Sequence, residues 1–167
     1  RGTNTGPALL AYPYGEFAAG LAALARELGF VAFGQHSGAI GATSDRRALP
    51  RYPMAEAFGE PESFALKAAS LPLPVAAAEP WEPVVRANPP RLEVTLAPFG
   101  GDPGRLACYQ GSERLDVQWL EADRRFAVRA GSALTPPRSR YNCTVPGPDG
   151  RYYWYSHLWV IPPGAPR

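Results

Sequence analysis

The sequence predicts a chain of two parts, an α/β segment followed by a small antiparallel β-sandwich. Near its start, an apolar run at residues 8–10 leads into Tyr12-Pro13-Tyr14-Gly15 and then into an amphipathic segment at residues 16–28. This is the order of a strand, a turn and a helix. Beyond a later proline-rich stretch, apolar residues alternate with polar ones. A period of two is typical of half-buried antiparallel strands.

The first part repeats one layout. We expect a strand at residues 8–12, a helix at 16–28 with Gly29 as its C-terminal cap, and a second strand at 30–33. The second strand ends in a loop at residues 34–41, which carries amide, imidazole and hydroxyl groups. Because the carboxyl ends of parallel strands share one edge of a sheet, we expect the two strand-ending loops to face one another.

The first part is completed by a third strand and a second helix. The third strand is expected at residues 49–54, where prolines suit its start and exit better than its interior. Pro61 suits the first turn of a helix that runs to about Ser70. The stretch that follows, up to Pro90, is rich in proline and lacks an apolar face, as semi-rigid spacers do. We therefore divide the chain into a domain at residues 1–75, a linker at 76–90 and a domain at 91–167.

The second domain is expected to be a β-sandwich of short strands separated by turn signals. The strands are predicted at residues 92–96, 105–109, 115–119, 126–128, 138–144 and 151–161. The last of them is aromatic on both faces, so one face must pack inward and the other must be covered or adhesive.

Cys108 and Cys143 are the only cysteines, and both lie in this second domain. One pair in a β domain can be a disulfide or two buried thiols. A bridge would close a loop for which chain entropy gives roughly 3 to 4 kcal/mol.

The composition limits the partners that we expect. The 167 residues suffice for one ordinary domain or two small ones, and the formal net charge is +2. The arginines form no stripe with interleaved aromatic residues, so we expect no nucleic-acid partner. No apolar run reaches the roughly 18 residues of a membrane-spanning helix. The chain starts at Arg1 without an initiator methionine, and we expect it to be a piece of a longer protein.

Three segments resemble the later part of the polysaccharide deacetylase family, the NodB-type carbohydrate esterases. These segments are residues 11–16, 33–41 and 49–54, and the strands around residues 139–143 and 153–159 are similar to a β domain attached to some bacterial members. The resemblance implies that the first part is the C-terminal portion of a (β/α) barrel. It also implies a periplasmic or secreted bacterial enzyme that removes acetyl groups from a polysaccharide containing N-acetylhexosamine. An exported protein in turn favours the Cys108–Cys143 bridge.

The resemblance implies a divalent metal, commonly zinc, held by an Asp and two His in motifs early in the barrel. No Asp-Asp pair and no His-x-x-x-His motif occurs in the sequence, whose only histidines are His36 and His157. We therefore expect the metal-binding half of the barrel to lie upstream, no metal to be held by this chain alone, and this chain by itself to be inactive.

By the resemblance, the backbone N–H of Tyr14 would stabilise the tetrahedral oxyanion, and a donor prepositioned by Pro13 at a helix start suits that role. The full set of residues expected to contact the polysaccharide is Tyr12, Pro13, Tyr14, Gln35, His36 and Trp159. Each has a structural alternative: the tyrosines could be wall residues, and a lone His36 more often bonds to backbone than to metal. His157 is expected to be structural, and the aromatic residues of the last strand could stack on sugars or form core.

Two functions of different classes follow. The leading hypothesis is a fragment of a metal-dependent polysaccharide deacetylase with an accessory β domain. The alternative is a non-catalytic carbohydrate-binding or assembly module that presents an aromatic β-strand as its platform.

Overall fold

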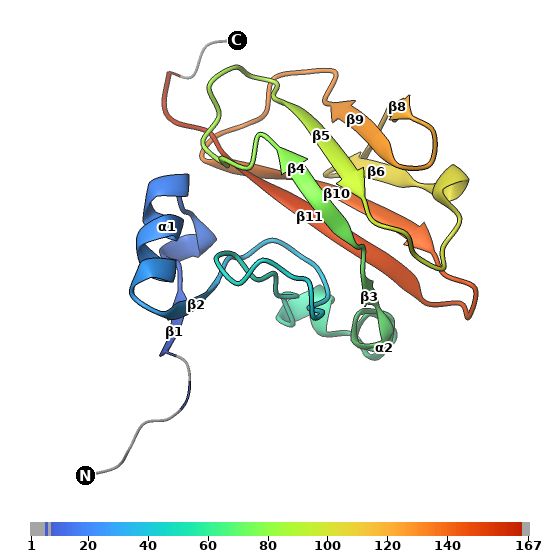
Figure 1. The fold of residues 1–167 in the computed structure, drawn as a ribbon, viewed down its shortest axis with the longest axis horizontal. Coiled ribbons are helices and arrows are strands. Elements are labelled where there is room, and N and C mark those ends of the chain that lie inside the picture. Colours follow the sequence, from blue (N-terminus) through green and yellow to red (C-terminus); the bar gives the residue numbers. More distant parts are fainter. Residues whose placement is uncertain (1–5, 7, 165–167) are drawn as a thin grey trace.

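The computed structural model describes Gly6 and residues 8–164, whose main body is two β-sheets packed face to face (Figure 1). The strand order of the larger sheet is β3-β11-β10-β6-β7, and that of the smaller sheet is β4-β5-β9-β8. All the pairings within these sheets are antiparallel except that of β3 with β11. The described chain is therefore a β-sandwich with an additional N-terminal unit.

The larger sheet is built around two long strands. Strands β10 (Arg138–Pro146) and β11 (Tyr152–Val160) pair along their whole length. The shorter strands of this sheet are β3 (Leu71–Pro72), β6 (Ala107–Gln110) and β7 (Glu113–Leu115). The Cys108–Cys143 disulfide joins β6 to β10 at directly opposed positions.

The smaller sheet covers one face of the larger one. It consists of β4 (Val75–Glu79), β5 (Arg91–Leu96), β8 (Gln118–Glu121) and β9 (Arg125–Arg129). The predicted alternation is present, since every second residue of β5 is buried. The shared core takes side chains from both sheets, including Leu92, Val94, Phe126, Val128, Tyr141, Cys143, Val145 and Trp159.

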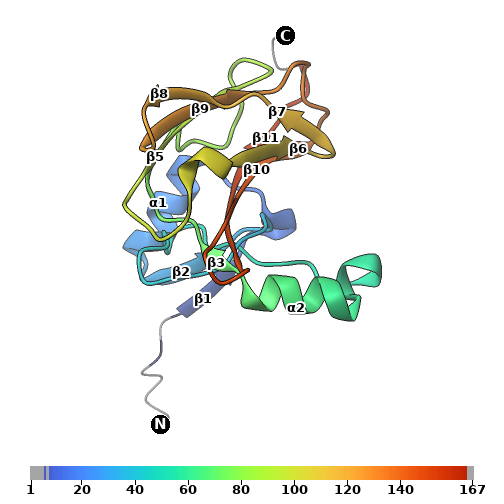
Figure 2. The same cartoon turned by 90° about the vertical axis from the view of Figure 1, so that its right-hand side faces the viewer.

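The N-terminal unit packs beside β11 (Figure 1). Strands β1 (Ala8–Ala11) and β2 (Phe30–Phe33) are parallel neighbours, and helix α1 (Ala19–Glu27) connects them. A second, smaller core forms here from Tyr12, Phe17, Ala22, Ala32 and Leu158 of β11. Helix α2 (Pro61–Ala69) projects away from the main body in Figure 2.

Two predicted elements are shorter than expected. Helix α1 begins at Ala19 rather than residue 16, because Pro13–Gly15 is a 3-10 turn and Ala18 is extended. The expected third strand contributes only a parallel bridge between Phe33 and Leu49. Pro50 and Pro53 lack the backbone N–H groups that further pairing would use.

The prediction of a partial (β/α) barrel is wrong. In the described residues, the parallel sheet of the N-terminal unit has two strands, and the rest of the fold is the β-sandwich with helix α2. The β-α-β order was predicted correctly, but it packs on β11 rather than on further parallel strands. The domain division at residues 75 and 90 stays a prediction. Strand β4 begins at Val75, continues into the expected linker and pairs with β5.

Candidate functional site

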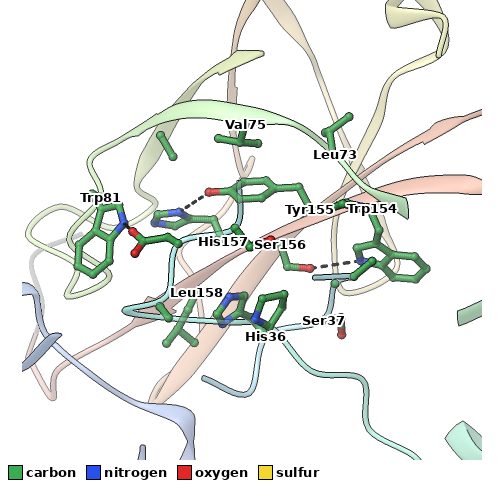
Figure 3. A pocket seen from close by; sticks show the side chains of 18 of the residues that line it. His36, Ser37, Leu73, Val75, Trp81, Trp154, Tyr155, Ser156, His157 and Leu158 are labelled. Atoms are coloured by element: carbon green, nitrogen blue, oxygen red, sulfur yellow. Dashed lines mark hydrogen bonds between the residues drawn. The ribbon is translucent and has the colours of Figure 1, made fainter. Parts of the chain in front are cut away.

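A cavity of about 280 Å³ lies where the N-terminal unit, β4 and β11 meet (Figure 3). Residues 154–158 of β11 form one wall, Val75 to Ala78 of β4 form a second, and the loop from His36 to Pro50 forms a third. Trp81, from the segment after β4, lies at the side of the cavity in Figure 3. The cavity is therefore formed by three segments that lie far apart in the sequence.

The pairing of β11 is interrupted along this cavity. The backbone N–H of Leu73 donates to the carbonyl of Trp154 at 3.1 Å, and the N–H of Val160 donates to the carbonyl of Pro83 at 2.8 Å. Strand backbone groups alternate in direction, so Ser156 and Leu158 also point their N–H and C=O groups away from β10. No backbone hydrogen bond from another described segment reaches those groups.

Two buried histidines line the cavity, His36 from the loop after β2 and His157 from β11. Nδ1 of His157 lies 3.1 Å from the hydroxyl of Tyr155, a hydrogen bond drawn in Figure 3. Nε2 of His157 and Nδ1 of His36 are buried without a partner among the described residues. Unpartnered buried nitrogens cost stability, and such atoms often mark a ligand or functional site.

Burial keeps both imidazoles neutral. It lowers the pKa of His36 to about 4, an effect that the carbonyl of Ala48 opposes and the positive charge of Arg140 reinforces. Burial lowers the pKa of His157 to about 3, with a smaller contribution from nearby His36. Burial also raises the pKa of Tyr155, so its hydroxyl stays protonated.

The side wall is fixed by one ion pair. Arg47 donates to Asp45 through Nε at 2.9 Å and stacks over the Trp81 ring at 4.2 Å, while Trp81 Nε1 donates to Asp45 at 3.0 Å. Burial acts to raise the pKa of Asp45, but these hydrogen bonds outweigh it and lower the pKa. Asp45 and Arg47 are the charged residues that line the cavity, so its walls carry no net charge at neutral pH.

The segment that carries Trp81 is held to helix α1. The carboxylate of Glu82 accepts hydrogen bonds from the N–H groups of Ala19, the first residue of α1, and Val84. A carboxylate at a helix N-terminus satisfies an N–H that the helix cannot pair and meets the favourable end of the helix dipole. Trp81 also lies 5.9 Å from the ring of Phe17.

Close packing on a glycine positions His36. A Cβ atom at Gly34 would lie 2.6 Å from Nδ1 of His36 and 3.5 Å from Phe17. The imidazole therefore packs directly on the backbone at the end of β2, in space that any larger residue at position 34 would take.

The structure scatters the residues predicted from sequence. His36 lines the cavity, whereas Tyr12 is 2% exposed and donates its hydroxyl to the carbonyl of Arg47 at 2.8 Å, behind the cavity wall. Trp159 is 1% exposed in the sandwich core, 4.4 Å from the ring of His157. Tyr14 is 76% exposed and lies outside the set of residues that line the cavity.

Pro13 and Gln35 also lie outside this cavity among the described residues. Gln35 is exposed and packs against Gly15 at the turn that follows β1. The predicted set thus does not form one site, although it contains one residue of the cavity.

Sequence analysis missed most of the cavity. The wall formed by β4 and Trp81 was assigned to a spacer, and Asp45 and Arg47 were not considered. One signal was present. Trp81 is a large aromatic residue between Pro80 and Pro83, and a tryptophan indicates a segment that is packed on the protein rather than a solvated spacer. His157 was considered but interpreted as structural.

Comparisons with known proteins add little beyond the fold. No family model and no curated protein sequence matches the chain. CopC from Methylosinus trichosporium OB3b is a similar solved structure, with 16% identity over 55% of this chain and 94% of that chain and a TM-score of 0.39.

Two auxiliary nutrient binding proteins are also similar in structure. The one from Bacteroides ovatus is 14% identical and the one from Bacteroides thetaiotaomicron 11% identical, each with a TM-score of 0.35. Each match covers 56% of this chain and 22% of the other chain, so this chain corresponds to a small part of those proteins.

The deacetylase resemblance is therefore wrong, and so is the hydrolase activity that it implied; the catalytic role given to the Tyr14 backbone rested on that activity alone. No family model supports the resemblance, and the described fold has no barrel segment for such an enzyme. Zinc was expected only as the metal of that enzyme, so this expectation loses its support as well. Within the described ranges, no group of three or more His, Cys, Asp or Glu side chains is placed to hold a metal ion.

The disulfide between Cys108 and Cys143 is present, and it is consistent with a protein exported to an oxidising compartment. Among the described residues, no helix is long and apolar enough to cross a membrane.

Proposed function

We propose that this chain is a non-catalytic binding module that holds one neutral saccharide unit in the cavity between β11, β4 and the His36 loop. The observation that supports this most is the combination of a concave cavity with both apolar and polar walls and backbone groups of β11 that lack partners among the described residues. Ligand sites are commonly of this kind, with apolar walls and a few polar groups that fix orientation.

Size and charge favour a small uncharged ligand. The cavity volume of about 280 Å³ is near the lower end of the usual range for ligand pockets, about 300–1,000 Å³. The histidines are neutral and Asp45 is paired with Arg47, so a charged ligand would find no uncompensated counter-charge.

Aromatic side chains beside hydrogen-bonding groups favour a sugar among the neutral ligands. Trp81, Trp154 and Tyr155 line the cavity, and aromatic faces suit the apolar face of a pyranose ring. The unpaired backbone groups of β11 and the polar side chains of the loop from His36 to Pro50 would meet its hydroxyl groups. We further propose a periplasmic or secreted location and a polysaccharide as the source of the saccharide; the disulfide supports the location.

The test is a thermal-shift and calorimetric titration of the protein with neutral monosaccharides and their short oligomers. A ligand at 100 times its Kd should stabilise the fold by about 2.7 kcal/mol. Ala77 is exposed on β4 and lines the cavity, so Ala77→Phe should block binding while leaving the fold intact.

The matched control is Ala122→Phe, in the exposed turn between β8 and β9 and remote from the cavity, which should bind as the wild type does. Absence of binding by every neutral saccharide, or equal binding by the wild type and Ala77→Phe, would refute the proposal.

A further inference from the structure

The unpaired stretch of β11 has the form of a gap in a parallel strand pairing. The chain runs beside β11 at Leu71–Pro72, leaves it to form β4, and returns beside it at Val84, which bridges to Val160 in the same parallel sense. Between these two contacts, the outward N–H and C=O groups of Ser156 and Leu158 face the cavity.

These groups are buried, because Ser156 is 3% exposed and Leu158 is 7% exposed. Buried backbone groups are almost always paired, and those left over usually bond to water or to a ligand. At the rise of a strand, about 3.3 Å per residue, the two residues offer matching groups roughly 6–7 Å apart. The cavity thus presents two donors and two acceptors in the plane of the sheet.

From this geometry we infer that the ligand carries a secondary amide, an acetamido group on the sugar, which lies in the β11 gap in the plane of the sheet. This inference rests on the proposed saccharide function and specifies the class of saccharide. The amide carbonyl accepts a hydrogen bond from the N–H of Ser156 or Leu158, as the backbone of a neighbouring strand would.

The two ends of the gap favour a compact amide over an extended peptide. A bound peptide strand would run along β11 in both directions, but Leu73 closes one end of the gap and Pro83 with Val85 closes the other, through their hydrogen bonds to β11. A chain of more than about two residues would therefore collide with the protein's own segments.

The walls favour an acetamido group over hydroxyl groups alone. Leu73, Val75 and Ala78 line the cavity and also pack on the sandwich core, so they present methyl groups next to the gap. The methyl group of an acetamide would contact such a surface, whereas a hydroxyl there would lose its hydrogen bonds to water.

A trans amide has its N–H opposite its C=O, so the N–H of the ligand would point away from β11. The polar side chains of the loop from His36 to Pro50, which forms another wall of the cavity, can accept from it. A hydroxyl oxygen or a carboxylate accepts such a hydrogen bond.

The test compares N-acetylglucosamine with glucose, which differ in the acetamido group, by calorimetry and by the amide proton signals of Ser156 and Leu158. We expect N-acetylglucosamine to bind at least about tenfold more tightly, because its acetamido group adds both a hydrogen bond and a methyl contact. We also expect slowed hydrogen exchange at one of the two amides in that complex alone.

Ala77→Phe is expected to abolish binding of both sugars, while Ala122→Phe should retain the preference for N-acetylglucosamine over glucose. Equal binding of the two sugars would overturn the inference and leave the proposed function standing. Binding of neither would also overturn the inference, and the titration with the other neutral saccharides would then decide the proposed function. A blocked peptide, N-acetyl-alanine methylamide, is the third arm. Tighter binding of that peptide than of N-acetylglucosamine would also overturn the inference.

Discussion

Strand β11 separates two cores of very different size, and the difference explains where the cavity lies. On one side, Trp159 joins the sandwich core, which lies between the two sheets and contains the Cys108–Cys143 disulfide. On the other side, Leu158 joins a small core around Tyr12 and Ala22. The cavity lies beside the part of β11 that the small core does not cover.

The two regions also differ in how well they cover their own apolar surface. In the N-terminal unit, Leu21, Leu24 and Leu28 of the α1 region are 45–63% exposed. In the sandwich, Leu92, Val94 and Phe126 are fully buried. The N-terminal unit therefore depends on β11 for its stability, whereas the sandwich has a core of its own, and this comparison can be tested by substitutions on each side.

Trp159→Ala should have the largest effect, because it removes a fully buried side chain from the sandwich core, where it packs 5.6 Å from Tyr141. Truncation of a buried tryptophan costs about 3–5 kcal/mol of unfolding free energy. Urea unfolding followed by circular dichroism measures this loss. A cost below about 1 kcal/mol, with sugar binding reduced, would show that Trp159 contacts ligand instead of forming core.

The same comparison shows what the sequence could predict. Alternation at Leu92, Val94 and Leu96 is a local pattern, and it predicted the sandwich strands because each strand buries one face. The β-α-β order of the N-terminal unit is also local. The number of strands that flank the β-α-β unit is not encoded in that local pattern. The same pattern therefore suited a barrel segment and a two-stranded sheet packed on β11 equally well.

The candidate site was less predictable for a related reason. His36 could be proposed because it follows a predicted strand in a loop of polar groups. The neighbours that make it part of a cavity, His157 and Ala77, come from distant segments, and each has an ordinary role in its own strand. The gap in the pairing of β11 arises from the path of residues 71–85. The spacing of apolar residues in the sequence does not predict that path.

Acid should have the second largest effect, because lowering the pH should reduce the free energy of unfolding through the two buried histidines that lie between the regions. An unfolded histidine has a pKa near 6.5, whereas burial lowers the pKa of His36 to about 4 and that of His157 to about 3. The unfolded state therefore binds protons first, so this stability is complete above about pH 6.5 and is lost as the pH falls toward the folded values. The loss should be about 1.4 kcal/mol per pH unit for each histidine, or about 2–3 kcal/mol for both at pH 5.5.

Unfolding free energies measured from pH 8 to pH 4.5 test this effect, with His36→Gln and His157→Gln as variants that each remove one titrating group. Each variant should show about half of the slope. The lowered pKa of Asp45 confines its contribution to the range below about pH 4. A flat profile between pH 7 and pH 5 would contradict the neutral, buried state of the two histidines.

Tyr12→Phe should have the smallest measurable effect and should act on the N-terminal unit alone. It keeps the ring, which stacks on Phe17 at 4.7 Å, but removes the hydroxyl that donates to the carbonyl of Arg47. One such hydrogen bond contributes about 1 kcal/mol. Native-state hydrogen exchange should show faster opening of β1 and β2, with the protection of β5 and β9 unchanged.

Tyr14→Phe is the matched control, since Tyr14 is 76% exposed and its loss of a hydroxyl should leave all four strands unaffected. Equal loss of protection in both regions of the Tyr12 variant would mean that they unfold as one unit, and the small core would then be part of the sandwich in its energetics despite its separate position.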